Sequence, residues 1–326
     1  MWAETVAWAS FDLAARPART PYMRRLVALG LVAGCGTAPV AAAPASGIVW
    51  SPVIDSHVHL ALWPVADELA KNGVLGAVDL AEPETALGGT LPIKVLAAGP
   101  MLTHRGGYPL DAWGSDGYGV GCDDAACVRS TIDRLASEGA AVIKLALDDD
   151  GLAPALVPVA VAAAHAHHLK VAVHALSDAA ARLAGQAGGD VLAHTPVEPL
   201  APETIALWRG RAVISTLAAF GGRASAVANL RALRAAGVTV LYGTDLGNQR
   251  DAGPSGDEVA LLRAAGLDDA AITAAMTTTP AAYWGFTFDL RIGPDATLLM
   301  LDRDPRRDAT ALLSPRAVYL RGHRIR

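Results

Sequence analysis

Two histidines, His57 and His59, stand two residues apart at the end of an apolar run in the segment PVIDSHVHL, residues 52–60. Side chains two apart in a strand lie on the same face, so both imidazoles point the same way. Imidazole nitrogens are common ligands of zinc and other transition metals, and such a pair can hold one ion. Histidines at strand ends are also often simply hydrogen-bonded, so a metal site requires further ligands.

Four more polar residues interrupt apolar segments that are expected to form strands. They are Lys144 in AAVIKLAL, His174 in VAVHAL, His194 in DVLAHTP and Asp245 in VLYGTDLG. Each stands at or near the carboxyl end of its segment. Burial of a lone lysine or aspartate costs free energy unless the charge is paired or bound to metal. The four interruptions therefore indicate one shared polar site.

Strands and helices must alternate along the chain to bring these residues together. From residue 48 onward, short runs rich in Val, Ile and Leu alternate with Ala-rich stretches that carry charged residues at helical spacing. The expected strands are Val53–Asp55, Val74–Leu80, Ile93–Ala98, Ala141–Leu147, Lys170–His174, Val191–His194, Ala212–Thr216 and Val238–Gly243. The expected helices include Asp124–Glu138, Leu156–His168, Asp178–Ala187, Glu203–Arg209 and Ala224–Ala236.

This alternation predicts an α/β fold, a (β/α)8 TIM barrel over residues 48–288. Such barrels have roughly 250 residues and carry their active sites at the carboxyl ends of the strands. An open doubly wound sheet is the alternative, but no glycine-rich nucleotide loop follows the first expected strand. The alternation of strand and helix patterns ends at DLRIGPDATLLMLDRDP, where a turn precedes a short strand. Residues 289–326 should therefore form a small, reduced β appendage.

Composition excludes some classes of function. The chain has 326 residues, is 52% hydrophobic and has a formal net charge of -5. These values fit a chain with one large hydrophobic core. The basic residues are scattered along the sequence and form no cluster that would bind a nucleic acid. A redox enzyme is disfavoured because a nucleotide-binding loop is lacking. A small-molecule substrate is the expected partner.

The N-terminal segment MRRLVALGLVAGC ends at Cys35 and resembles a bacterial lipoprotein signal. Its apolar run is too short to cross a bilayer, which needs roughly 20 helical residues. Residues 1–34 would be an upstream extension and a cleaved signal peptide, with translation starting at Met23, and residues 35–47 would be a flexible tether. A lipid on Cys35 would anchor the protein in the periplasm or cell envelope, as its one contact with the membrane. Export would permit a disulfide between Cys122 and Cys127, and two free thiols are the alternative.

Taken in order and in their strand contexts, the polar residues resemble the amidohydrolase superfamily, in particular its imidazolonepropionase-like and prolidase-like branch. The set is Asp55, His57, His59, Lys144, His174, His194 and Asp245. The segments AAGPMLT with the following RGG, TTTPAAYWG and RIGPDATLLMLDRDP extend the similarity over almost all of residues 48–326.

The resemblance implies two divalent metal ions. Zinc is the default, and manganese, cobalt or iron could occupy the same ligands. His57, His59 and Asp245 would hold the first ion, and His174 and His194 the second. Lys144 would be carboxylated and would bridge the two, because a carbamate offers two anionic oxygens where an ammonium offers none.

The implied reaction is hydrolysis of a C–N bond in a small molecule, an amide, a cyclic amide or a dipeptide-like substrate, by a hydroxide that bridges the metals. Asp245 would move the proton to the leaving amine, and Asp55 would hold a histidine in one tautomer. The same core supports lactone, ester and phosphotriester hydrolysis. A lipid-tethered metal- or ligand-binding protein without turnover is a third alternative, which the intact Asp245 and Lys144 argue against.

A long loop from Gly99 to Asp123 follows the third expected strand and is interpreted as a lid over the substrate. The expected substrate-binding residues are His104, Arg105, Tyr108, Trp113 and Asn248, with Arg105 meeting a substrate carboxylate. Family members carry a β-sandwich built from both sides of the barrel, which is reduced in this chain. Its exposed strand edges would be kept short or covered by a second subunit in a homo-oligomer.

Overall fold

The computed structural model describes residues 47–148 and 150–326. The expected signal peptide, Cys35 and all of the tether except its last residue lie outside these residues. All the expected strands of the repeating pattern are present. They are β2 (Val53–Val58), β3 (Val74–Asp79), β4 (Lys94–Ala97), β7 (Val142–Ala146), β8 (Lys170–His174), β9 (Val191–Leu192), β10 (Ala212–Ile214) and β11 (Thr239–Leu241).

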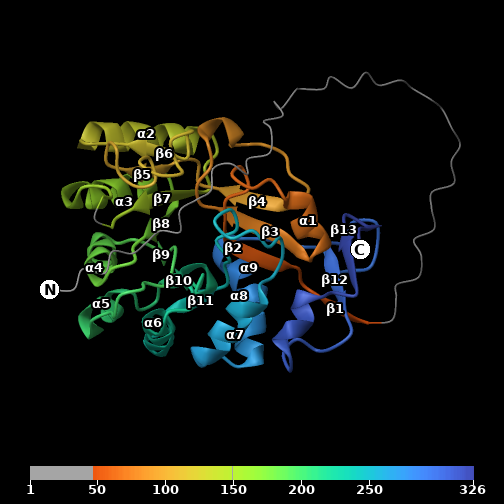
Figure 1. Ribbon diagram of the computed structural model, residues 1–326. Helices are drawn as coiled ribbons and strands as arrows, with labels where there is room; N and C mark the ends of the chain where they lie inside the picture. Colours follow the sequence, from red (N-terminus) through yellow and green to blue (C-terminus); the bar gives the residue numbers. More distant parts are fainter. Residues whose placement is uncertain (1–46, 149) are drawn as a thin grey trace, which may run out of the picture. The chain divides into compact units, whose positions relative to one another are not determined.

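These strands form two parallel sheets (Figure 1). The larger sheet has seven strands in the order β11-β10-β9-β8-β7-β5-β6, and the smaller has the order β2-β3-β4. Strands β5 (Met101–Thr103) and β6 (Gly119–Gly121) belong to the long loop that was expected to be a lid. The fold is therefore mixed α/β with a parallel sheet of seven strands.

Backbone hydrogen bonds join the two sheets at both of their meeting edges. Ala141 N donates to Ala97 O at 2.8 Å, which links the end of β4 to the start of β7. Ser56 N donates to Tyr242 O, and Asp245 N donates to His57 O, both at 2.9 Å. These two bonds place β2 beside the segment that follows β11.

Helices cover the outer side of these strands (Figure 1). Five were expected from the sequence: α2 (Ala125–Ser137), α3 (Val157–Ala166), α4 (Asp178–Ala187), α5 (Pro202–Leu207) and α6 (Ala224–Ala235). Four others are α1 (Ala66–Lys71), α7 (Gly256–Ala264), α8 (Asp269–Met276) and α9 (Thr278–Trp284). Asp124 and Ser177 cap α2 and α4, where each side chain accepts a backbone N–H of the first turn. Among the described residues no helix is long and apolar enough to cross a membrane.

Alternation along the strands separates an outer and an inner core. In β7, Ile143 and Leu145 belong to the large cluster that packs against the helices, whereas Val142 belongs to a second cluster with residues of other strands. Lys144 is two residues after Val142 and so shares its face. His174 follows Ala172 in β8 in the same way. The apolar inner faces of these strands thus end in the polar residues of the site.

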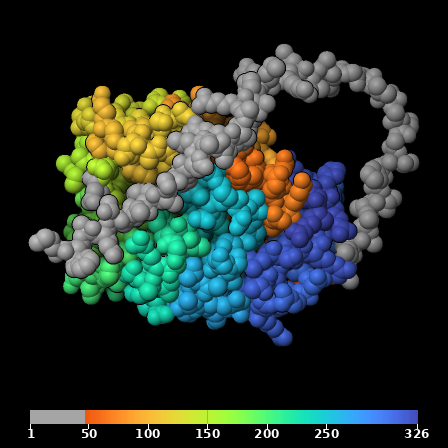
Figure 2. Space-filling model, viewed as in Figure 1, coloured from red at the N-terminus to blue at the C-terminus, as the bar shows by residue number. Residues whose placement is uncertain are grey.

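A separate antiparallel sheet has the order β1-β12-β13-β14, with β1 (Ile48–Trp50), β12 (Leu298–Leu301), β13 (Ala317–Leu320) and β14 (His323–Arg324). We expected residue 48 to begin the main fold and the appendage to lie wholly at the C-terminus. Instead Ile48 pairs with Leu301. Figure 1 shows β1 beside β12, and in Figure 2 an orange surface from the early part of the described chain adjoins the blue surface of the C-terminal part. A three-residue strand that pairs with a segment distant in sequence leaves no local pattern from which its partner could be predicted.

Glu258 in α7 is fully buried and holds the loop after β10, where it accepts hydrogen bonds from Leu217 N and Ala218 N. Burial raises the pKa of its carboxyl from 4.5 to about 7, and the hydrogen bonds lower it by less. The folded state therefore binds this proton more tightly than the unfolded chain does. The resulting stabilisation amounts to about 3 kcal/mol. It is fully present below pH ~4.5 and is lost as the pH rises through about 7.

We therefore expect Glu258→Gln to change how the stability depends on pH. Relative to the wild type, the variant should gain about 3 kcal/mol in free energy of unfolding between pH ~4.5 and ~7.5, because it lacks the titrating group. Urea unfolding across this range measures the difference. Glu203→Gln, at an exposed position of α5, is the matched control. Parallel curves for wild type and Glu258→Gln would contradict the prediction.

Candidate active site

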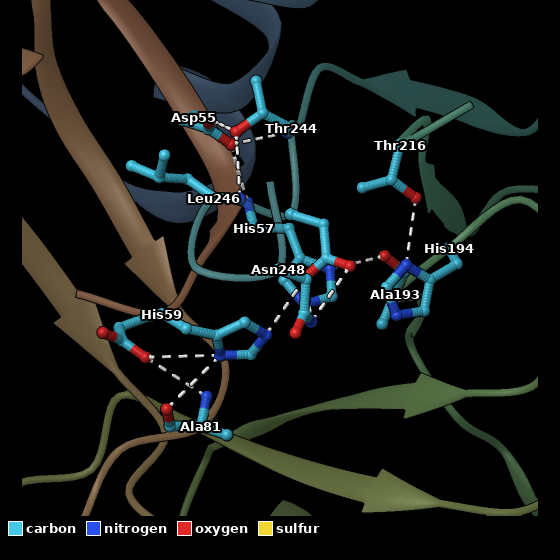
Figure 3. A network of polar contacts seen from close by, with 12 residues as sticks. Asp55, His57, His59, Ala81, Ala193, His194, Thr216, Thr244, Leu246 and Asn248 are labelled. Atoms are coloured by element: carbon cyan, nitrogen blue, oxygen red, sulfur yellow. Dashed lines mark hydrogen bonds and ion pairs between the residues drawn. The ribbon is translucent and has the colours of Figure 1, made fainter. Parts of the chain in front are cut away.

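Three of the predicted ligands converge at the end of β2 and in the segment after β11. Figure 3 labels two of them, His57 and His59. His57, His59 and Asp245 are buried, and each offers one ligand atom within 4.8 Å of the others. The Asp245 Oδ1 atom lies 3.2 Å from His59 Nε2 and 3.6 Å from His57 Nε2. Asp245 has a φ of 59°, a conformation that is uncommon outside glycine and is typical of functional sites.

Hydrogen bonds fix the tautomers of these histidines. His57 Nδ1 lies 2.8 Å from Ala193 O, and His59 Nδ1 lies 3.3 Å from Ala81 O. A carbonyl oxygen only accepts, so each Nδ1 carries the proton and each Nε2 keeps a lone pair. His57 Nε2 is buried without a hydrogen bond. This arrangement is the usual one for metal-ligating imidazoles.

His194 and His174 continue the same cluster. The His57 and His194 ring centroids are 4.4 Å apart, and those of His174 and His194 are 4.9 Å apart. His194 Nδ1 lies 3.0 Å from Thr216 Oγ1, which orients that ring. Burial is the main cause that lowers the pKa of both histidines, that of His174 to about 3, so both are neutral and able to bind a cation.

His174 presents its nitrogens in the opposite sense. Its Nδ1 is buried and has no hydrogen-bond partner, while its Nε2 lies 3.4 Å from Asp148 Oδ2. Asp148 is itself fixed, because it accepts hydrogen bonds from Leu176 N and from both the N–H and the hydroxyl of Ser177. Asp148 therefore favours the tautomer with the proton on Nε2. The unprotonated Nδ1 keeps its lone pair, with which it could bind a metal ion.

Asp148→Asn should weaken binding of one metal ion by about 10- to 100-fold, since an asparagine nitrogen in place of Oδ2 cannot accept from His174. Competition with a chromophoric zinc chelator measures the affinity. Asp111→Asn, which removes an exposed carboxylate of the lid loop, should leave it unchanged. Equal affinities for wild type and Asp148→Asn would show that His174 does not depend on this carboxylate.

Lys144 lies fully buried among the histidines, and its Nζ has no hydrogen-bond partner. Burial lowers the pKa of the amine to about 7, although the charges of Asp245 and Asp79 raise it in part. Lys144 pairs across the sheet with Ala172, two residues before His174. Its positive charge also lowers the pKa of His57, His174 and His194. A buried amine without a hydrogen-bond partner fits conversion to a carbamate. The carbamate oxygens would act as metal ligands together with the neighbouring histidines.

The role expected for Asp55 needs correction. Its carboxylate contacts no histidine ring, because backbone carbonyls already hold His57 and His59. Instead it accepts from His57 N at 3.1 Å and from Thr244 N and Oγ1 at 3.0 and 2.5 Å. Burial raises its pKa to about 7. Asp55 thus ties the end of β2 to the turn that carries Asp245.

Three of the expected substrate-binding residues lie directly on the cluster. The Trp113 ring is 5.0 Å from that of His59, and the Tyr108 ring is 4.8 Å from that of His174. Trp113 Nε1 donates to Tyr108 OH at 3.1 Å. Asn248 Nδ2 donates to Asp245 Oδ1 at 3.1 Å. Tyr108 and Trp113 of the long loop thus pack against the histidine cluster.

The other two expected residues do not meet the site. The Arg105 side chain is 79% exposed and pairs with Asp123 at the base of the lid. His104 Nδ1 lies 2.7 Å from Asp150 O. The expectation that Arg105 meets a substrate carboxylate is wrong for this conformation, because the arginine finds a partner within its own loop.

The lid ends at a disulfide between Cys122 and Cys127, which decides between the two alternatives left open by the sequence.

Besides Asp148, sequence reasoning missed Asp79 and Phe220. Asp79, at the end of β3, accepts from Leu60 N and Ala81 N, and its Oδ1 is 4.0 Å from His59 Nδ1. A carboxylate that ends the apolar run VLGAVDL was a usable signal for it. Phe220 packs 4.9 Å from the His194 ring and had no comparable signal.

No family model and no curated protein matches the chain. Solved structures do match. A Xaa-Pro dipeptidase with methionine bound in its active site is 18% identical with a TM-score of 0.71, and an amidohydrolase is 21% identical with a TM-score of 0.68; each match covers 85% of this chain and 86% of the other. The A. niger ochratoxinase is 19% identical with a TM-score of 0.70, over 85% of this chain and 82% of its own. The chain shares the fold of these enzymes. At such identities the match extends to the fold alone.

Proposed function

We propose that the protein is a metal-dependent hydrolase of the amidohydrolase type, which cleaves a C–N bond of a small molecule at a binuclear centre. The observation that carries this proposal is the convergence of His57, His59 and Asp245 beside a buried, unpartnered Lys144. The fold shared with amidohydrolase and dipeptidase structures supports it. So do the bonds that link both edges of the two parallel sheets, from which we infer a closed eight-stranded barrel.

His57, His59 and Asp245 would hold one ion, and His174 and His194 would hold a second. Carboxylated Lys144 would bind both ions. Two divalent ions, zinc by default, supply Lewis acidity that polarises the scissile carbonyl and makes water nucleophilic near neutral pH. The Nε2 atoms of His57 and His59, whose Nδ1 atoms face backbone carbonyls, and the unpartnered Nδ1 of His174 fit this assignment.

The chain's own residues handle the proton and exclude solvent. Asp245 is the carboxylate beside the free histidine nitrogens, and it would accept a proton from the attacking water and deliver it to the leaving nitrogen. Asn248 orients it by donating to its Oδ1 atom. Tyr108 and Trp113 cover the cluster, so that proton transfer takes place away from bulk water.

A substrate panel tests the reaction class. The zinc-reconstituted protein should hydrolyse at least one member among dipeptides, N-acyl amino acids and cyclic ureides, and chelation should abolish the activity. Hydrolysis of lactones or phosphotriesters alone would replace the C–N assignment with the ester-type alternative. Metal binding without turnover of any member would favour the non-catalytic alternative.

We also propose that the chain is exported and anchored through a lipid on Cys35. The basic, apolar and small residues before Cys35 and the Cys122–Cys127 disulfide support this proposal. Intact-mass analysis of protein extracted from membranes should give a chain that begins at Cys35 and carries added acyl mass. An unmodified chain that begins at Met1 would contradict it.

A further inference from the structure

Exposed apolar side chains gather at the C-terminal antiparallel sheet. Among the described residues, three large hydrophobic side chains are exposed, and none of them belongs to the two parallel sheets or their helices. Ile48 begins β1, whereas Leu290 and Ile292, which are 41% and 57% exposed, belong to the loop between α9 and β12. Single exposed apolar residues are common, but a group of them bordered by charged residues indicates a binding surface.

The loop that carries Leu290 and Ile292 places them beside basic side chains. Thr297 N donates to Asp289 O at 2.7 Å, which closes the loop. Leu290 lines one depression of the surface together with Arg291 and Lys94. The Arg291 side chain pairs with Asp289 but is 90% exposed. Lys94 donates to a backbone carbonyl, and no Asp or Glu of the described residues pairs with it.

The turn between β13 and β14 brings further arginines to this loop. Arg321 N donates to Thr297 Oγ1 at 3.2 Å, and Gly322 N donates to Ala296 O at 2.9 Å. The turn therefore packs directly against residues 289–297. Arg324 follows in β14 and donates to a backbone oxygen. Both arginines are exposed, and in the part of the chain that the structure describes neither pairs with an Asp or Glu side chain.

The charge of the C-terminal segment is opposite in sign to that of the whole chain. Residues 289–326 carry eight arginines and five aspartates, whereas the formal net charge of the chain is -5. Within the loop, Asp289 is already paired, so Asp295 is the one aspartate of residues 289–297 that could offset the basic residues named above. A cationic region on an otherwise acidic protein directs this side of the molecule toward a negatively charged surface.

The described chain also begins at this sheet. Its first residue is residue 47, and β1 follows at once and pairs with β12. The proposed tether, residues 35–47, would therefore join the lipid on Cys35 to the sheet that carries the basic residues. One lipid anchor holds a protein near a membrane, and a basic patch is a second signal that makes the attachment stable.

We propose that Lys94, Leu290, Ile292, Arg321 and Arg324, which we call the C-terminal patch, form a docking surface for a bilayer that contains anionic phospholipids. The two apolar side chains enter the headgroup region, and the cationic groups contact the lipid phosphates. The proposed lipid anchor brings the protein to the membrane. Binding of the C-terminal patch to a bilayer depends neither on that anchor nor on the proposed reaction.

Co-sedimentation with vesicles tests the docking surface. The chain from residue 35 onward with Cys35→Ser keeps the tether and every described residue but cannot carry the lipid. This parent chain should bind phosphatidylcholine vesicles that contain about 30% phosphatidylglycerol at least ~10-fold more tightly than vesicles of phosphatidylcholine alone. The preference should decrease as the salt concentration rises, because salt screens exposed charges.

Variants of the C-terminal patch should weaken this binding. Arg321→Gln combined with Arg324→Gln should lower the affinity for the anionic vesicles by ~10-fold or more, because each cationic residue near the surface adds to the attraction. Ile292→Ser should also lower it, because an apolar side chain no longer enters the bilayer. The matched control is Arg129→Gln combined with Arg209→Gln, which removes two exposed arginines outside the C-terminal patch and should bind as the parent does.

Equal binding of the two kinds of vesicle by the parent chain, or no binding, would overturn the inference. Unchanged affinity in either folded variant of the C-terminal patch would also overturn it. Sedimentation velocity without vesicles examines a second copy of the chain as the occupant. A dimer that Ile292→Ser dissociates, without any binding to vesicles, would assign this surface to self-association. Vesicle binding by the patch in a protein whose Cys35 carries no acyl mass would contradict the proposed anchor and support this inference.

Discussion

Replacing Asp245 with Asn should lower kcat by about 10³-fold or more, with part of the bound metal retained. The asparagine keeps one oxygen beside His57 and His59 but cannot accept a proton, and general acid–base catalysis contributes roughly 10²- to 10⁴-fold. The hydrogen bond from Asn248 also loses its charged acceptor. Steady-state kinetics with the best substrate of the panel, together with metal analysis of the same sample, measure both effects.

Asp251→Asn is the matched control for Asp245, because it removes an exposed carboxylate from the same loop. It should leave kcat and metal content unchanged. If Asp245→Asn retained wild-type kcat, the proton-transfer role would be refuted. If it lost all its metal as well as its activity, Asp245 would be a ligand without a demonstrated role in proton transfer.

Lys144→Ala should lose both metal and turnover. The alanine cannot form a carbamate, and the remaining histidines are neutral, so Asp245 would be the one anionic protein ligand left against the charge of two divalent ions. We expect a fall of about 10³-fold in kcat/KM, which corresponds to about 4 kcal/mol of transition-state stabilisation. Lys71→Ala, at an exposed position of α1, should behave as the wild type.

The same lysine predicts a pH dependence of reconstitution. Its amine has a pKa near 7, so the neutral, reactive form increases as the pH rises through that value. Metal-free protein should therefore recover activity faster with zinc and bicarbonate at pH ~8 than at pH ~6. Carbon-13 NMR with labelled bicarbonate should detect a carbamate in the wild type and not in Lys144→Ala. A fully metallated, active wild type without a carbamate signal would rule out the bridging role.

The sequence predicted the strands and the polar cluster because both depend on local patterns. Apolar runs such as AAVIKLAL and VAVHAL must be buried, so a lysine or histidine within them has to serve some purpose. The carboxyl ends of parallel strands also meet at one edge, which is enough to bring Lys144 and His174 together without knowledge of the loops.

The parts that sequence reasoning missed depend on contacts distant in the chain. Ile48–Trp50 joins β12 through pairing across almost the whole described chain. Arg105 was assigned to the substrate because its partner, Asp123, is recognisable only once the lid is folded. Asp148 follows a strand as a turn residue does, and only its contact with His174 in the folded chain distinguishes it. Asp55 has the right position for a histidine partner, but the backbone carbonyl of Ala193 occupies that role.

The most direct test of the account is the metal content of the purified protein after reconstitution with zinc, measured by plasma mass spectrometry. The binuclear site predicts about two equivalents per chain in the wild type. A double variant, His57→Ala with His59→Ala, should lose at least one of them. A wild type that binds no zinc, or a double variant with unchanged content, would contradict the assignment of these histidines to a metal centre.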